Sequence, residues 1–116
     1  MKIRQIKELL NARVLCGEDK LDGEVHSACG CDMMSDVLAF VKDQAVLLTG
    51  LCNPQVVRTA MMMDMRCIVF VRGKAPSEDI IRLAEDTGIV AMATDERMYV
   101  ACGTLYCNGL HGGECQ

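Results

Sequence analysis

The stretch AVLLTGLCNPQVVRTA, residues 45–60, has the order of a strand, a turn and a helix. Its apolar run AVLLT is continuous rather than alternating, which is typical of a strand covered on both faces. Asn53 can cap the helix that follows, and Pro54 suits its first position, where no N–H is needed. The apolar residues of this helix are spaced to form one stripe: Val56, Val57, Ala60 and Met61.

The same pattern occurs twice more. The runs CIVFV, residues 67–71, and IVAMA, residues 89–93, each begin 22 residues after the start of the previous run. We expect the second helix to begin near Ser77 and to end at Gly88, and the third to begin at Thr94. The third helix should have Met98, Ala101, Cys102 and Leu105 on one face. Residues 45–105 therefore predict a βαβαβα order. Strands that are joined through helices by right-handed crossovers form a parallel sheet with helices packed on it. We therefore expect the α/β class: a Rossmann-like single domain with a mainly parallel sheet.

The first 44 residues are less regular. We expect an amphipathic helix over residues 3–10, with Ile3, Ile6, Leu9 and Leu10 as its apolar residues. We also expect short strands within 13–16 and 24–30, and a turn at 17–23 between them. Asp32 or Ser35 can cap a further helix, with these apolar residues on one face: Met34, Val37, Leu38 and Val41. The glycine-rich end predicts a flexible tail at 107–116, within one domain of residues 1–116.

The net charge of −4 argues against nucleic acid and against an anionic membrane surface as partners. The first residues do not resemble a signal peptide, so we expect a cytoplasmic protein whose eight cysteines are reduced and mostly structural. The cysteines lack the paired spacing of a zinc ribbon or of a ferredoxin, so we expect no metal and no cofactor. One buried face of a helix cannot hold three consecutive methionines, so at least one residue of the run Met61–Met63 should approach the surface. The run suits either the filling of gaps in a core with few aromatic residues or a surface that binds a partner.

Ligands of parallel α/β sheets bind beyond the carboxyl ends of the strands. The candidate ligand-binding residues at these ends are Thr49, Gly50, Asn53, Arg72, Gly73 and Thr94. Helix N-termini and a guanidinium there suit a phosphate or a carboxylate. Glycine, asparagine and threonine are also ordinary turn and cap residues, so the structural interpretation stays open. Cys52 is a candidate nucleophile at this edge. No histidine lies nearby in the sequence, although the fold could bring His26 close to it, and we expect no catalytic residues and no enzyme activity.

Three parts of the chain carry a resemblance to a known family: the strand end LLTG at 47–50, the turn GKAP at 73–76 and the strand TGIVAMAT at 87–94. With the order of elements over residues 14–110, the chain resembles the DRTGG domain family. In that family the domain stands alone, or beside CBS domains in some pyrophosphatases, or within some phosphotransacetylases. Two family positions differ here, because Leu51-Cys52 replaces an Asp-Arg pair and Val71-Arg72-Gly73 replaces Thr-Gly-Gly.

The resemblance implies a regulatory or interaction module without chemistry of its own, acting as a homodimer. Stand-alone members are often encoded near iron-only hydrogenase components, which implies a link to hydrogenase or to anaerobic energy metabolism. The candidate dimer interfaces are the helix after Asn53 and the irregular first third of the chain. A protein partner is one expectation. The alternative is a small-molecule sensor that binds a nucleotide or another phosphorylated metabolite at the carboxyl ends of the strands.

Overall fold

The computed structural model describes residues 1–40 and 44–112 of the chain. Their strands form one sheet in the order β1-β5-β4-β3-β2. The strands are β1 (Arg13–Cys16), β2 (Ser27–Gly30), β3 (Ala45–Thr49), β4 (Cys67–Phe70) and β5 (Val90–Ala93). Strands β2 to β5 pair in parallel, and β1 pairs antiparallel with β5 at one edge. The expected mainly parallel sheet through the three apolar runs is confirmed.

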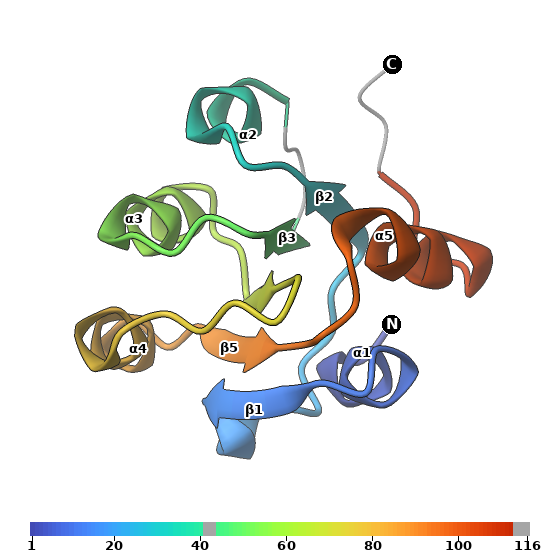
Figure 1. Cartoon of the computed structure of the whole chain (residues 1–116), viewed down its shortest axis with the longest axis horizontal. Helices are drawn as coiled ribbons and strands as arrows, with labels where there is room; N and C mark the ends of the chain where they lie inside the picture. Colours follow the sequence, from blue (N-terminus) through green and yellow to red (C-terminus); the bar gives the residue numbers. More distant parts are fainter. Residues whose placement is uncertain (41–43, 113–116) are drawn as a thin grey trace.

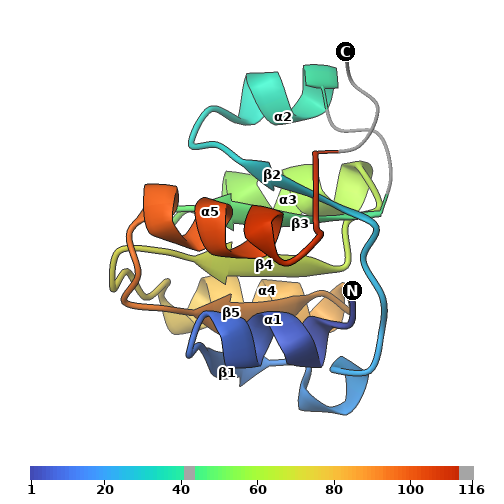
Figure 2. The ribbon, with the colours of Figure 1, turned by 90° about the vertical axis from the view of Figure 1, so that its right-hand side faces the viewer.

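Helices cover both faces of this sheet (Figure 1). The helices are α1 (Ile3–Leu9), α2 (Met34–Phe40), α3 (Pro54–Met62), α4 (Glu78–Asp86) and α5 (Met98–Cys107), with a short 3-10 turn η1 (Glu18–Lys20). The crossover helices α2, α3 and α4 lie on one face, and α1 and α5 lie side by side on the other (Figures 1 and 2). None of the described helices has the length and apolar character needed to cross a membrane.

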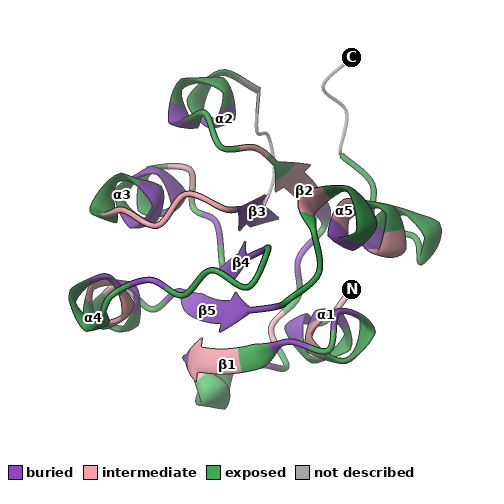
Figure 3. Ribbon diagram, viewed as in Figure 1, coloured by how far each residue is buried: buried purple, intermediate pink, exposed green. Residues whose placement is uncertain are grey.

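Two apolar cores separate the layers. Alternate side chains of each central strand enter opposite cores, so Val46 and Leu48 of β3 face α1 and α5, while Leu47 faces α2 to α4. The central strands β3, β4 and β5 are buried throughout (Figure 3). Burial on both faces is the physical reason why these strands are continuous apolar runs in the sequence.

Helix α3 begins as expected. The Asn53 side chain accepts a hydrogen bond from the Gln55 amide at 2.9 Å, and Pro54 occupies the first turn. The expected stripe is correct for Val56, Val57 and Ala60, which are buried, and wrong for Met61, which is 52% exposed. Met61 and Met62 lie in the last turn of the nine-residue helix α3, and both side chains are exposed to solvent. The prediction that the methionine run reaches the surface is therefore confirmed.

The start predicted for the last helix is wrong. Helix α5 begins at Met98 with Arg97 in the cap position, and the segment from Thr94 to Arg97 is an extended turn. The Thr94 hydroxyl does not cap a helix, because it donates to the Leu10 carbonyl at 2.6 Å and thereby joins the end of β5 to the end of α1.

The front third follows the prediction in outline. Helix α1, strand β1, the turn with η1 and strand β2 all occur, but Leu9 is exposed and lies off the buried face of α1. In α2, Val37 is buried and Leu38 is 40% exposed, and Val41 lies outside the described residues. At the other end of the chain, residues 108–112 are irregular, yet Leu110 is buried and the His111 carbonyl accepts a hydrogen bond from Ala28. Residues 113–116 of the expected tail lie outside the description.

Candidate functional site

The carboxyl ends of β2, β3, β4 and β5 meet at one edge of the sheet, because these strands are parallel. Three of the six candidate residues, Thr49, Gly50 and Arg72, surround a common partner there, the side chain of Asp32. Asn53 lies at the same edge, where it caps α3. Gly73 and Thr94 lie further along, where β4 and β5 end.

Asp32 follows the end of β2 and is the centre of this polar cluster. One carboxylate oxygen accepts hydrogen bonds from the Thr49 hydroxyl at 2.9 Å and from the Gly50 amide at 2.8 Å. The other oxygen lies 3.5 Å from the guanidinium of Arg72. The Gly50 amide is the main reason why the pKa of Asp32 is lowered, with help from Thr49 and Arg72 and against the effect of partial burial.

From the sequence, Asp32 was expected only as a possible helix cap, and this role was not predicted. Asp32 follows a parallel strand just as Gly50 and Arg72 do, so the rule that selected those residues also applies to it. The position of β2 beside β3 decides the contact, and a single sequence does not show that order.

Arg72 has an unusual backbone for its residue type. Its φ is +64°, in the left-handed region that a non-glycine residue rarely adopts, and Gly73 follows at +70°. Its guanidinium lies against the backbone of Gly50, where an added Cβ would overlap it. The side chain is still 45% exposed, and its ion pair with Asp32 is therefore weak. Arg72 is thus held at the strand ends by the backbone, with charge left available to solvent.

Thr49 and Thr94 are buried, at 0% and 1% exposure, and their hydroxyl groups donate within the protein. The amide of Gly73 donates to the Thr94 carbonyl at 3.0 Å, which links the turn after β4 to the end of β5. These residues shape the edge, while Arg72 presents a charged group to solvent.

Cys52 does not have the surroundings of a nucleophile. Partial burial raises the pKa of its thiol, although Lys74 and Arg72 act in the opposite direction. His26 does not approach it, because His26 precedes β2 and its amide donates to the Gln44 carbonyl, just before β3 begins. The two residues therefore lie at opposite ends of the sheet, and the suggestion that the fold brings them together is wrong.

No disulfide involves these described cysteines: Cys16, Cys31, Cys52, Cys67, Cys102 and Cys107. Burial raises the pKa of the Cys67 and Cys16 thiols, so both stay protonated. Across residues 1–40 and 44–112, no three His, Cys, Asp or Glu side chains are grouped so that they could hold a metal ion. Cys115 lies outside this range.

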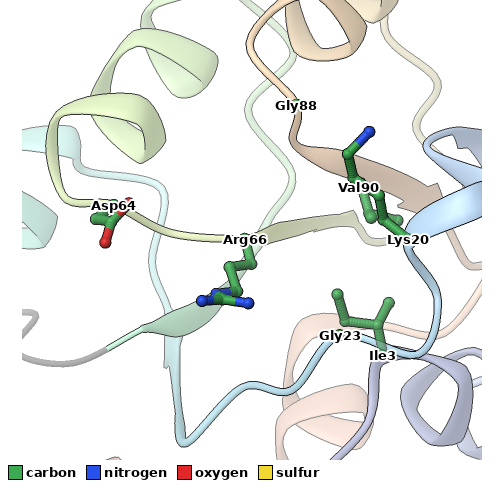
Figure 4. Close-up of a pocket in the computed structure, with 7 residues that line it drawn as sticks. All are labelled: Ile3, Lys20, Gly23, Asp64, Arg66, Gly88 and Val90. Atoms are coloured by element: carbon green, nitrogen blue, oxygen red, sulfur yellow. The ribbon is translucent and has the colours of Figure 1, made fainter.

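A cavity of about 420 Å³ lies at the opposite edge, where β4 and β5 begin (Figure 4). It is lined by Ile3, Lys20, Gly23, Asp64, Arg66, Gly88 and Val90. Its side chains carry both charge signs, with Asp64 and Arg66 coming from the segment before β4. This amino-end cavity is the alternative location for a small ligand.

The fold and the strand-end cluster define a class: a small α/β domain with a parallel sheet and a polar group of side chains at its carboxyl edge. The chain belongs to the DRTGG domain family, whose model matches residues 5–105. Comparison with curated proteins found no similar sequence.

One solved structure with the same fold is the crystal structure of the CBS and DRTGG domains of the regulatory region of Clostridium perfringens pyrophosphatase, complexed with the activator diadenosine tetraphosphate. The TM-score is 0.71 at 17% sequence identity, over 90% of this chain and 45% of that chain. At this identity the likeness shows the fold alone, and the present chain spans less than half the length of its structural relative.

Proposed function

We propose that this chain is a regulatory domain without chemistry of its own, and that it senses a nucleotide or another phosphorylated metabolite at the carboxyl ends of its strands. Family membership and the nucleotide bound in the crystallised regulatory region support this class of function. We also propose that the chain forms a homodimer and that it is cytoplasmic. The link to hydrogenase or anaerobic energy metabolism stays a prediction.

The half-exposed guanidinium of Arg72 is the observation that carries the proposal. Backbone strain in the left-handed region persists where the surrounding structure imposes it, and it is concentrated at binding and switch sites. Here the strain of Arg72 places a cation beside glycine backbone, at the edge where ligands of parallel sheets bind. A guanidinium binds phosphate oxygens in a paired geometry.

The Asp32 carboxylate would compete with a bound phosphate for Arg72. A phosphate that contacts Arg72 must compete with the carboxylate of Asp32, which already holds the Gly50 amide. The ion pair is long and half-exposed, so its loss is a small penalty that a multiply charged phosphate can offset. We therefore propose Arg72, Gly50 and Asn53 as contacts, with Asp32 as the internal competitor and Thr49, Gly73 and Thr94 as structural support.

A thermal-shift series tests this proposal. The probes are AMP, ATP, diadenosine tetraphosphate and inorganic phosphate. A ligand at a hundredfold excess over its dissociation constant should stabilise the domain by about 2.7 kcal/mol, which corresponds to roughly 10 °C for a domain of this size. Arg72→Gln should abolish the shift.

Arg66→Gln is the matched control, because Arg66 is an exposed arginine at the amino-end cavity. A shift that survives Arg72→Gln and disappears in Arg66→Gln would move the site to that cavity. If none of the four probes shifts the wild-type protein, the nucleotide-sensor proposal is wrong.

A further inference from the structure

Helix α5 has an apolar outer face as well as an apolar inner face. Ala101 and Leu105 are buried against the sheet, while Tyr99 is 90% exposed, Val100 47% and Tyr106 61%. The helix sequence MYVACGTLYC contains no charged residue. A helix that is apolar all round is normally buried, yet the outer side of α5 is exposed in the isolated chain (Figure 3). The exposed side chains line a hollow of about 420 Å³.

Gly103 lies in the middle of this face. A glycine inside a helix costs roughly 1 kcal/mol relative to alanine. Nothing among the described residues explains that cost, since a Cβ added at Gly103 would meet none of their atoms within 4 Å. A glycine on an open face permits the close approach of another backbone.

The residues around Gly103 are arranged symmetrically. Positions three and four residues away are its neighbours on the helix surface, and they are Val100 and Tyr106, and Tyr99 and Cys107. All four are exposed. If two α5 helices cross antiparallel on a two-fold axis at Gly103, Tyr99 meets Cys107 of the other copy and Val100 meets Tyr106. A two-fold contact requires this self-complementary pattern.

We infer that the outer face of α5 is the surface through which two copies of this chain associate, which rests on the homodimer proposed above and names its interface. The α5 face carries no charge that could bind a charged partner. Two chains of net charge −4 repel each other overall, and the uncharged α5 face lets them meet without placing like charges opposite one another. The Thr104 hydroxyl beside this face already donates to the Val100 carbonyl at 2.8 Å.

The size of the face sets the expected strength. The two tyrosines and their neighbours would bury on the order of 500–600 Å² per copy, at the lower end for specific protein interfaces. The dimer should therefore form at micromolar concentration and dissociate on dilution.

Light scattering after size exclusion, without added ligand, tests this interface. Wild-type protein at high micromolar concentration should have twice the chain mass of 12.7 kDa, and Val100→Lys should have the single mass. Met62→Lys is the matched control, because Met62 is 68% exposed on α3, one of the two candidate interfaces predicted from the sequence. It should leave the dimer intact.

A crosslinking experiment gives an independent readout. In a Cys107→Ser background, Gly103→Cys places one thiol of each copy at the proposed axis, and oxidation should yield a covalent dimer much faster than Met62→Cys does. Wild-type protein that stays monomeric, a dimer disrupted only by Met62→Lys, or equal crosslinking rates would each overturn the α5 interface. Nucleotide binding is measured separately, so a monomer that still binds a nucleotide refutes the interface and leaves the sensor proposal standing.

Discussion

At the residue scale, the carboxylate of Asp32 links the end of β3, through Thr49 and Gly50, to Arg72 after β4. Its lowered pKa means that the folded state favours the ionised form. The stabilisation is present above the carboxyl pKa of the unfolded chain, about 3.9, and is lost as the pH falls through the lower pKa of the folded state.

We therefore expect Asp32→Asn to lower the free energy of unfolding at pH 7 by about 0.5–1 kcal/mol, because the amide oxygen still accepts hydrogen bonds but the charge is gone and the site is half-exposed. The difference from wild type should shrink below about pH 4. Urea unfolding across this pH range measures it, with the exposed Asp86→Asn as control. A difference that does not change with pH would contradict the role of the charge.

Thr59 is the second informative residue. Its hydroxyl is buried in α3 and has no hydrogen-bond partner among the described residues. Thr59→Val replaces the hydroxyl with a methyl group of similar size, and we expect it to raise the free energy of unfolding by about 1 kcal/mol. Thr87→Val is the control and should lower stability, because the Thr87 hydroxyl donates to Leu83 at 2.9 Å. A loss of stability in both variants would show that Thr59 has a partner in solution.

At the element scale, the position of α5 over β2 depends on Gly30. A Cβ at this position would lie 2.5 Å from the sulfur of Cys102 and 3.2 Å from that of Met98. Gly30→Ala should therefore destabilise the domain by about 1–3 kcal/mol through overpacking. Adding Cys102→Ala should restore part of the loss, and a double-mutant cycle in urea measures the coupling. Strictly additive effects would show that α5 does not pack on Gly30.

At the scale of the whole molecule, stability should decrease from the centre of the sheet to its edges. Strands β3 and β4 are buried and paired on both sides, whereas β1 is an edge strand with an irregular register between Val14 and Cys16. In native-state hydrogen exchange, the amides of β3 and β4 should exchange near the global unfolding free energy and those of β1 faster. Equal protection in β1 would mean that another chain pairs with or covers this edge.

The sequence by itself determined the α/β class, the parallel strands and the helix that begins after Asn53. Strands buried on both faces need continuous apolar runs, and a surface helix needs a spaced stripe, so both are local patterns. It also placed Thr49, Gly50 and Arg72 at one edge, because carboxyl ends of parallel strands share an edge. Only the tertiary structure decided the contacts that depend on strand order: Asp32 with Gly50, and Thr94 with Leu10. For α5 the spacing predicted the face of Ala101 and Leu105, which is buried, whereas only the structure shows that the opposite face with Tyr99 and Tyr106 stays exposed, because the sheet packs against one side of the helix.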